Sequence, residues 1–107
     1  LGLNFNNELL NDILSYNNAA LRYAAMNGHL EVVKYLVSCG LKLKDIRSSN
    51  MAALRWAARN GHLEVVKYLY SLGLNIDDIR SNNNWALRLA AMNGHLEVVQ
   101  YLESIES

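Results

Sequence analysis

Residues 20–36 read ALRYAAMNGHLEVVKYL, and this stretch decides the fold because it recurs twice further along the chain. The second copy, ALRWAARNGHLEVVKYL, begins at Ala53, and the third, ALRLAAMNGHLEVVQYL, begins at Ala86. The offset in residue number is therefore the same in both steps, from 20 to 53 and from 53 to 86. A fixed period of this length is typical of arrays in which one supersecondary unit is copied and stacked. We therefore expect one domain built from a few equivalent units.

Each copy predicts two helices separated by a glycine. In the first unit, residues 20–27 carry leucine and alanine at helical spacing. Gly28 then ends the helix, because glycine enters the left-handed region without a Cβ penalty. Residues 30–38 form the second helix, whose leucines and valines share one face. The predicted fold class is all-α, an α-solenoid of stacked helix-turn-helix repeats.

Polar stretches join the units at residues 41–50 and 74–83. We expect them to be extended loops with turns at Asn50 and Asn83, and Asn17 stands in the same register. Asparagine suits such turns because its short polar side chain tolerates the left-handed backbone.

Composition excludes several classes of protein. Apolar residues make up 51% of the chain, enough to bury a core. Ten Lys and Arg balance ten Asp and Glu, so the basic excess of a general nucleic-acid binder is missing. No apolar run reaches the ~18 residues of a membrane span. The single cysteine, Cys39, allows no internal disulfide, and we expect its side chain to be buried. The lack of disulfides fits a reducing compartment, so we expect the protein to be intracellular, in the cytoplasm.

No catalytic or metal-binding constellation is evident. The chain has no Gly-rich phosphate loop, no GxSxG and no CxxC. His29, His62 and His95 recur once per unit, but stacked helices sit ~8–10 Å apart, whereas zinc ligands each lie ~2 Å from one ion. We therefore expect a non-enzyme without metal, cofactor or small-molecule substrate. Tyr23 and Trp56, large residues at one position of the unit, are expected to pack in the core.

The GHLEVVKYL string, the LxxAA helix before it and the constant period of the copies resemble the ankyrin repeat. The resemblance runs from about Asp12 to Ser107 and is specific, since period, glycines and string agree three times. The near-identical units, the ALR opening and the Asn-rich loops look like the ankyrin arrays of amoeba-infecting giant viruses, which would place the protein in the host cytoplasm.

One departure from the family concerns the first helix of each repeat. Ankyrin repeats usually open it with Thr-Pro-Leu-His, whereas this chain has no proline and has arginine in place of that histidine. We expect the three arginines to replace the family's Thr–His hydrogen bonding by donating to loop carbonyls or to aspartates. The arginines are Arg22, Arg55 and Arg88, and the aspartates are Asp45 and Asp78.

The resemblance implies a single ankyrin-repeat domain over residues 1–107. Its expected parts are an N-terminal capping segment or partial repeat (1–18), two repeats (19–51 and 52–84) and a C-terminal capping repeat (85–107). The last assignment rests on Glu103, a charged residue where the earlier units have Val37 and Tyr70. An amphipathic N-terminal helix is expected to cover the first repeat with its apolar residues, which are Phe5, Leu9, Leu10, Ile13 and Leu14.

The function that the resemblance implies is protein–protein interaction without catalysis, by a monomer that presents a rigid concave groove. Candidate contact residues are those that differ between the copies, at the loop tips and the first-helix ends, because the repeated framework is identical. They are Tyr16, Asn18, Met26, Ser49, Met51, Arg59, Asn82, Asn84, Trp85 and Met92. The alternative is a structural or capping segment of a longer array with no partner of its own; nucleic-acid and membrane partners are not expected.

Overall fold

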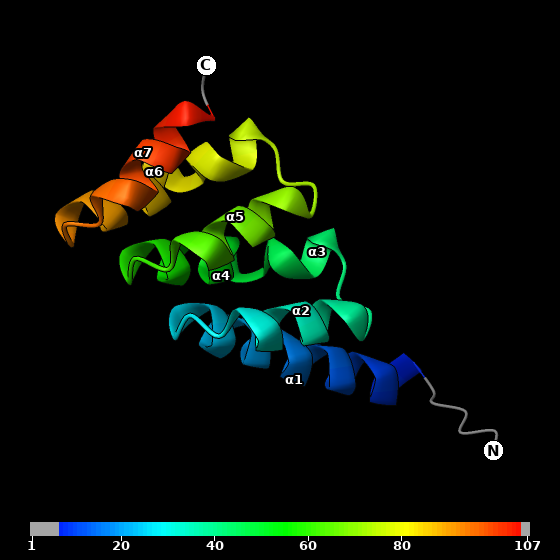
Figure 1. The fold of residues 1–107 in the computed structure, drawn as a ribbon. Coiled ribbons are helices and arrows are strands. Elements are labelled where there is room, and N and C mark those ends of the chain that lie inside the picture. Colours follow the sequence, from blue (N-terminus) through cyan, green and yellow to red (C-terminus); the bar gives the residue numbers. More distant parts are fainter. Residues whose placement is uncertain (1–6, 106–107) are drawn as a thin grey trace.

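The computed structural model describes the backbone of residues 7–105 and the side chains of residues 16 and 18–105. Within that part the chain forms seven helices and no strand, which confirms the all-α solenoid. Figure 1 shows antiparallel helix pairs stacked from the N-terminal end to the C-terminal end. The pairs are α1 (Asn7–Met26) with α2 (Leu30–Ser38), α4 (Ser48–Arg59) with α5 (Leu63–Ser71), and α6 (Ile76–Met92) with α7 (Leu96–Ser104), and the short α3 (Leu43–Ile46) follows the first pair.

One apolar core runs through all three pairs. Leu21 and Leu54 on the first helices, and Leu69 and Leu102 on the second helices, are almost completely buried. Ala25 and its equivalents have no bulk beyond Cβ, so neighbouring first helices approach closely. The first helices accordingly pack more closely on one another than the second helices do. No pair can bury its apolar faces alone, so stability depends on the neighbouring pairs.

The segments between the pairs differ from the expected extended loops. Residues 43–46 form α3, and the equivalent segment begins α6, so the prediction of extended loops is wrong. Each segment has a backbone cap: the Lys42 amide donates to Asp45 (N···Oδ2 2.8 Å), and the Asn75 amide donates to Asp78 (2.9 Å). Aspartate at the third helical position satisfies a backbone donor that would otherwise lack a partner, which favours a helical turn here.

The left-handed turns at the two asparagines are confirmed. Three consecutive residues, 49–51, have φ between 54° and 63°, and residues 82–84 repeat this conformation. After these turns the right-handed helix resumes at Ala52 in α4 and at Trp85 in α6, the residues at which the second and third repeats were expected to begin. The prediction for Asn17 is wrong, because α1 runs through it as one helix.

The N-terminal capping segment remains a prediction. Its expected boundary after residue 18 falls inside α1, which continues into the first repeat without a break. The apolar residues expected to form its packing face lie outside the described side chains.

The arginine ladder is confirmed in part. Arg55 donates to two carbonyls of the left-handed turn, Asn50 O (Nε···O 2.7 Å) and Ser49 O (Nη2···O 3.0 Å). Arg88 makes the same pair of bonds to residues 83 and 82, at 2.9 and 3.4 Å. Arg22 has no such bond in the part of the chain that is described, because α1 forms no turn there. Of the two kinds of acceptor expected, Arg55 and Arg88 thus bind the turn carbonyls and not the aspartates.

Histidine and glycine form one of the contacts between successive pairs, beside the shared apolar core. Gly28 and Gly61 have φ of +74° and +76°. A Cβ added to Gly28 would lie 2.7 Å from His62 Cε1, and a Cβ added to Gly61 would lie 2.7 Å from His95 Cε1. Each ring therefore occupies the space that a side chain at the preceding glycine would need. Each ring thus lies against the preceding pair, and successive contacts lie one repeat period apart in the sequence.

Candidate functional site

The side of the stack formed by the first helices exposes aromatic side chains. A pocket of about 370 Å³ is lined by Arg22, Tyr23, Met26 and Trp56. Tyr23 is 66% exposed and Trp56 is 38% exposed, so the prediction that they are core residues is wrong. The reason is helical geometry: Leu21 and the two alanines after Tyr23 occupy the inward positions, and residue 23 points away from them.

Arginines lie against the two tryptophans of this surface. The Arg55 guanidinium carbon lies 4.1 Å from the centroid of the Trp85 ring, which belongs to the next pair. Arg59 lies over Trp56, at 5.2 Å from the ring centroid. Cation–π contacts of this kind hold both partners in position while leaving much of the aromatic surface accessible. We call this side of the stack the first-helix face. It is defined by Arg22, Tyr23, Met26, Arg55, Trp56, Arg59, Trp85 and Met92.

Of the predicted contact residues, several fall on the first-helix face or near it. The pocket includes Met26, Arg59 lies over one of its walls, and Trp85 and Met92 are exposed on α6. Apart from Met51, the other predicted contact residues lie at the turns and on α1, outside the pocket, and their side chains are exposed or half-buried. These are Tyr16, Asn18, Ser49, Asn82 and Asn84.

Two predictions about side chains are wrong. Met51 is only 4% exposed, because the third residue of the left-handed turn directs its side chain into the core, so it is not a contact residue. Cys39 is exposed, because it follows the last residue of α2 at the edge of the stack. Asn18 has a structural contact, since its amide donates to Asp45 (Nδ2···Oδ1 3.3 Å).

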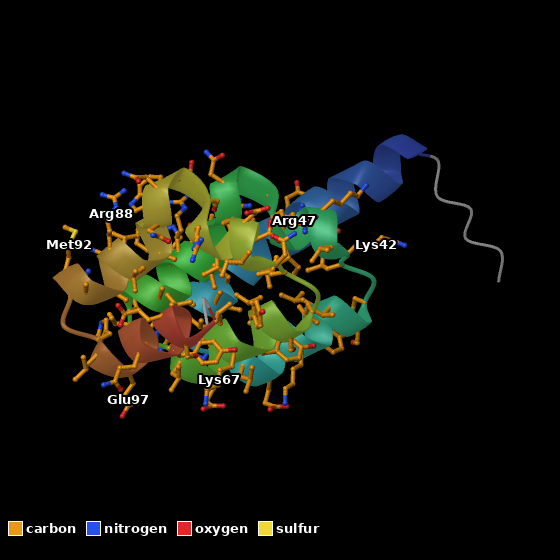
Figure 2. The ribbon with its side chains drawn as sticks, turned by 90° about the horizontal axis from the view of Figure 1, so that it is seen from above. Lys42, Arg47, Lys67, Arg88, Met92 and Glu97 are labelled. Atoms are coloured by element: carbon orange, nitrogen blue, oxygen red, sulfur yellow. The ribbon has the colours of Figure 1, made fainter. Side chains whose placement is uncertain are left out.

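Charge is divided between the two sides of the stack. Residues 18–27, 52–60 and 85–93, which contain the first-helix face, carry four arginines and no Asp or Glu. The second helices carry glutamates, with lysines paired to Glu31 and Glu64 at 3.8 Å. Figure 2 shows Arg88 and Met92 on one side and Lys67 and Glu97 on the opposite side. The zero net charge of the chain thus conceals a basic first-helix face.

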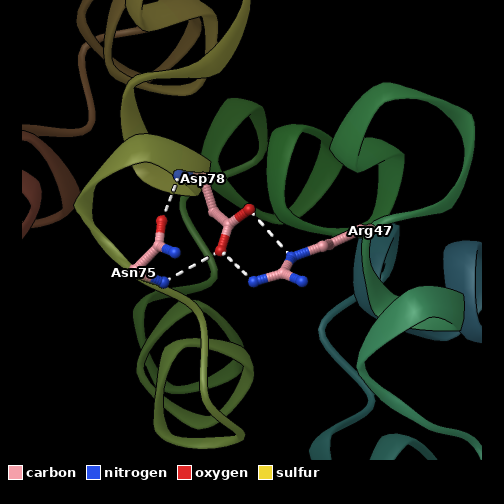
Figure 3. Close-up of polar contacts among 3 residues, drawn as sticks. All are labelled: Arg47, Asn75 and Asp78. Carbon is pink, nitrogen blue, oxygen red and sulfur yellow. Dashed lines mark hydrogen bonds and ion pairs between the residues drawn. The ribbon is translucent and has the colours of Figure 1, made fainter.

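A separate polar cluster lies at the start of α6 (Figure 3). Arg47 donates two hydrogen bonds to Asp78, from Nε at 2.9 Å and from Nη2 at 2.8 Å. The Asp78 amide donates to the Asn75 side chain at 2.9 Å. Burial by itself would raise the pKa of Asp78, but the bonds from Arg47 and the Asn75 amide, with the Arg47 charge, lower it below its usual range. This cluster connects α3 to α6 and is structural.

No three His, Cys, Asp or Glu side chains gather as a metal ion would need in the described part of the chain. No described helix combines the length and apolar character that crossing a bilayer requires.

A family model described as ankyrin repeats (3 copies) matches residues 2–80 and, in a second match, residues 45–106. The chain belongs to the ankyrin repeat family. Ankyrin repeats generally mediate protein–protein interactions and typically have no catalytic activity. A search of curated proteins found no match to this ankyrin-repeat chain. Comparing the repeat copies in the sequence identified part of the first-helix face, namely Met26, Arg59, Trp85 and Met92. It did not identify Arg22, Tyr23 or Trp56 as part of this face.

Proposed function

We propose that this ankyrin-repeat chain is a non-catalytic interaction module that binds an acidic segment of a protein partner on its first-helix face. The observation that carries the proposal is the pocket beside Arg22, whose other walls are Tyr23, Met26 and Trp56. Its volume of about 370 Å³ lies within the range of ligand pockets, so it has room for an apolar side chain of a partner together with neighbouring atoms. Aromatic residues, methionine and arginine are the types enriched in interface cores.

The charges around the pocket favour carboxylates in the partner. Arg22 forms part of the pocket wall, and Arg59 lies over Trp56 beside it. A guanidinium binds a carboxylate with two parallel hydrogen bonds, which sets orientation as well as affinity. No acidic side chain of residues 18–27 or 52–60 competes for these arginines. A partner segment with one apolar anchor and nearby Asp or Glu would therefore complement the surface.

The rigidity of the stack supports binding by a preformed surface. The closer packing of the first helices supports curvature toward this side, and three pairs spaced ~10 Å apart would give a groove ~30 Å long. Arg55 and Arg88 are held by the turn carbonyls, so their positions are fixed before binding. Less ordering entropy is then lost on binding. We include a cytoplasmic location in the proposal, since an exposed unpaired Cys39 suits a reducing compartment.

The experiment is selection of random peptides on the immobilised chain, followed by affinity measurement with fluorescence anisotropy. We expect the selected peptides to share an apolar residue flanked by Asp or Glu. Trp56→Ala and Arg22→Ala should each weaken binding at least about tenfold, as loss of an interface hot spot does. Glu97→Ala, on the opposite side of the stack (Figure 2), is the matched control and should leave the affinity unchanged.

Two outcomes would contradict the proposal. Selected peptides without acidic residues would refute the partner chemistry, and equal affinity for wild type and Trp56→Ala would refute the location. Thermal melting of each variant shows whether the fold persists. Single-stranded RNA is tested in parallel: tight binding that falls steeply with salt would assign the arginines to phosphates instead.

A further inference from the structure

The two ends of the stack expose residues that are buried inside it. Equivalent residues make each contact between neighbouring pairs. The exposed fraction of a residue at an end of the stack can therefore be compared with that of its equivalents inside the stack. Val65 and Val98 are each 1% exposed, whereas the equivalent Val32 in the first pair is 47% exposed. Tyr68 and Tyr101 are partly buried, whereas the equivalent Tyr35 is 67% exposed. Among the described residues, the N-terminal end of the stack thus presents an exposed contact surface.

The C-terminal end shows the opposite half of the same contact. Leu96 is 64% exposed, although the equivalent Leu30 and Leu63 are partly buried against the core. Ala91 is exposed, although its equivalents in the other two first helices are completely buried. Together with Gly94, His95 and Val99, these residues line a pocket of about 200 Å³. The C-terminal end therefore has an apolar centre as well as the charged Glu103 at its edge.

Gly94 marks the position that a further histidine would occupy. Its φ of +75° matches Gly28 and Gly61, yet nothing lies within 4 Å of a Cβ added to it. In the two internal contacts that space holds the histidine ring of the next pair. The first pair supplies such a ring in His29, which is exposed. The two ends are therefore complementary halves of a contact that the molecule already makes twice.

From this complementarity we infer that the ends bind each other between molecules, so that a second copy of the chain stacks head to tail on the first. His29 of one copy lies on Gly94 of the other, and Val32 packs against Ala91 and Leu96. The two ends are at opposite extremes of the stack (Figure 1), so one copy cannot join its own ends. Such a heterologous contact does not close and produces open chains of molecules. The zero net charge offers no general repulsion between copies.

The contact between copies is weaker than the internal ones for a reason visible in the sequence. Inside the stack, Lys34 lies 5.8 Å from the Tyr68 ring centroid and Lys67 lies 5.7 Å from that of Tyr101. At the C-terminal end the equivalent residue is Gln100, which carries no charge to place over the Tyr35 ring of the next copy. The contact between copies is therefore weak, so the chain associates at high concentration and dissociates to monomers on dilution.

Sedimentation velocity over a range of protein concentrations tests the inference. Wild type should show a weight-average sedimentation coefficient that rises with concentration. Leu96→Glu and Val32→Glu each place a charge at an exposed position of one end, so each should fold and remain monomeric. Gln100→Lys should restore the cation–π contact and tighten association several-fold. Met92→Glu, exposed on the first-helix face, is the matched control and should associate as wild type does.

Mixing the two monomeric variants gives the decisive result. Leu96→Glu retains an intact N-terminal end and Val32→Glu retains an intact C-terminal end, so the mixture should form a 1:1 dimer and nothing larger. A mixture that remains monomeric, or a wild type that stays monomeric at millimolar concentration, overturns the inference. Association that Met92→Glu abolishes also overturns it, because the contact then involves the first-helix face.

Discussion

Replacement of Gly61 by alanine separates backbone strain from the packing between helix pairs. Gly61 and Gly94 share a left-handed backbone, with φ of +76° and +75°. Alanine in that conformation costs roughly 1–2 kcal/mol at either position. At Gly61 the new Cβ would also meet the His95 ring, 2.7 Å from Cε1, whereas at Gly94 it meets nothing within 4 Å. Gly94→Ala is thus a control with the same strain and no neighbour.

The magnitude follows from the contact. Carbon atoms do not pack at 2.7 Å, so the His95 ring must leave its place between the pairs or the pairs must separate. Overpacking of this kind costs about 1–3 kcal/mol beyond the strain. We expect Gly94→Ala to lower the free energy of unfolding by roughly 1–2 kcal/mol and Gly61→Ala to lower it by roughly 2–5 kcal/mol.

The assay is urea unfolding followed by circular dichroism, with a double-mutant cycle that includes His95→Ala. With the ring removed, Gly61→Ala should cost no more than Gly94→Ala, because only the strain remains. Equal losses for Gly61→Ala and Gly94→Ala in the wild-type background would refute the histidine–glycine contact. An unchanged cost of Gly61→Ala after His95→Ala would refute it as well.

Three further predictions concern the turns and the polar cluster. Arg55→Ala should lower the free energy of unfolding by about 1.5–3 kcal/mol, because two carbonyls of a left-handed turn lose a charged donor, and Arg55→Lys should restore only part of it in the same urea assay. The pKa of Asp78 is lowered, so the stability that its carboxylate contributes is complete above the ordinary carboxyl pKa of ~4 and is lost as the pH falls through the lowered value. The difference in melting temperature between wild type and Asp78→Asn should therefore shrink in acid. A difference that stays constant with pH would contradict the contact with Arg47. Met51→Ala should cost about 2–5 kcal/mol by leaving a cavity, whereas a surface contact residue would cost almost nothing in thermal melting.

The sequence predicts the repeated framework well because it is encoded locally. The glycine at the end of the first helix and the apolar face of the second helix depend on spacings within one unit, and α2 spans the expected residues 30–38. The positive φ of Asn50 and Asn83 was likewise predictable from residue type. Such features need no knowledge of how units are arranged in space.

The direction of individual side chains was harder to predict. A position that is large and apolar in each copy suggested a core residue, yet Tyr23 is exposed. The helical spacing of Leu21 and the alanines after residue 23 could have shown that the Tyr23 side chain points away from the core. The burial of Met51 depends on three successive left-handed residues, which no periodicity encodes. The exposure of Val32 and Leu96 is a property of position in the stack, so identical sequences behave differently at the ends and in the middle.

Both the binding face and the complementary ends follow from one claim, that one period of the repeated sequence corresponds to one step along the stack. Nuclear Overhauser contacts between the histidine rings and the glycine α protons measure that step directly. The structure predicts contacts from His62 to Gly28 and from His95 to Gly61, and in dilute protein no contact to Gly94 from a histidine ring of another helix pair. Contacts among the three histidine rings, or the absence of both histidine–glycine pairs, would contradict it.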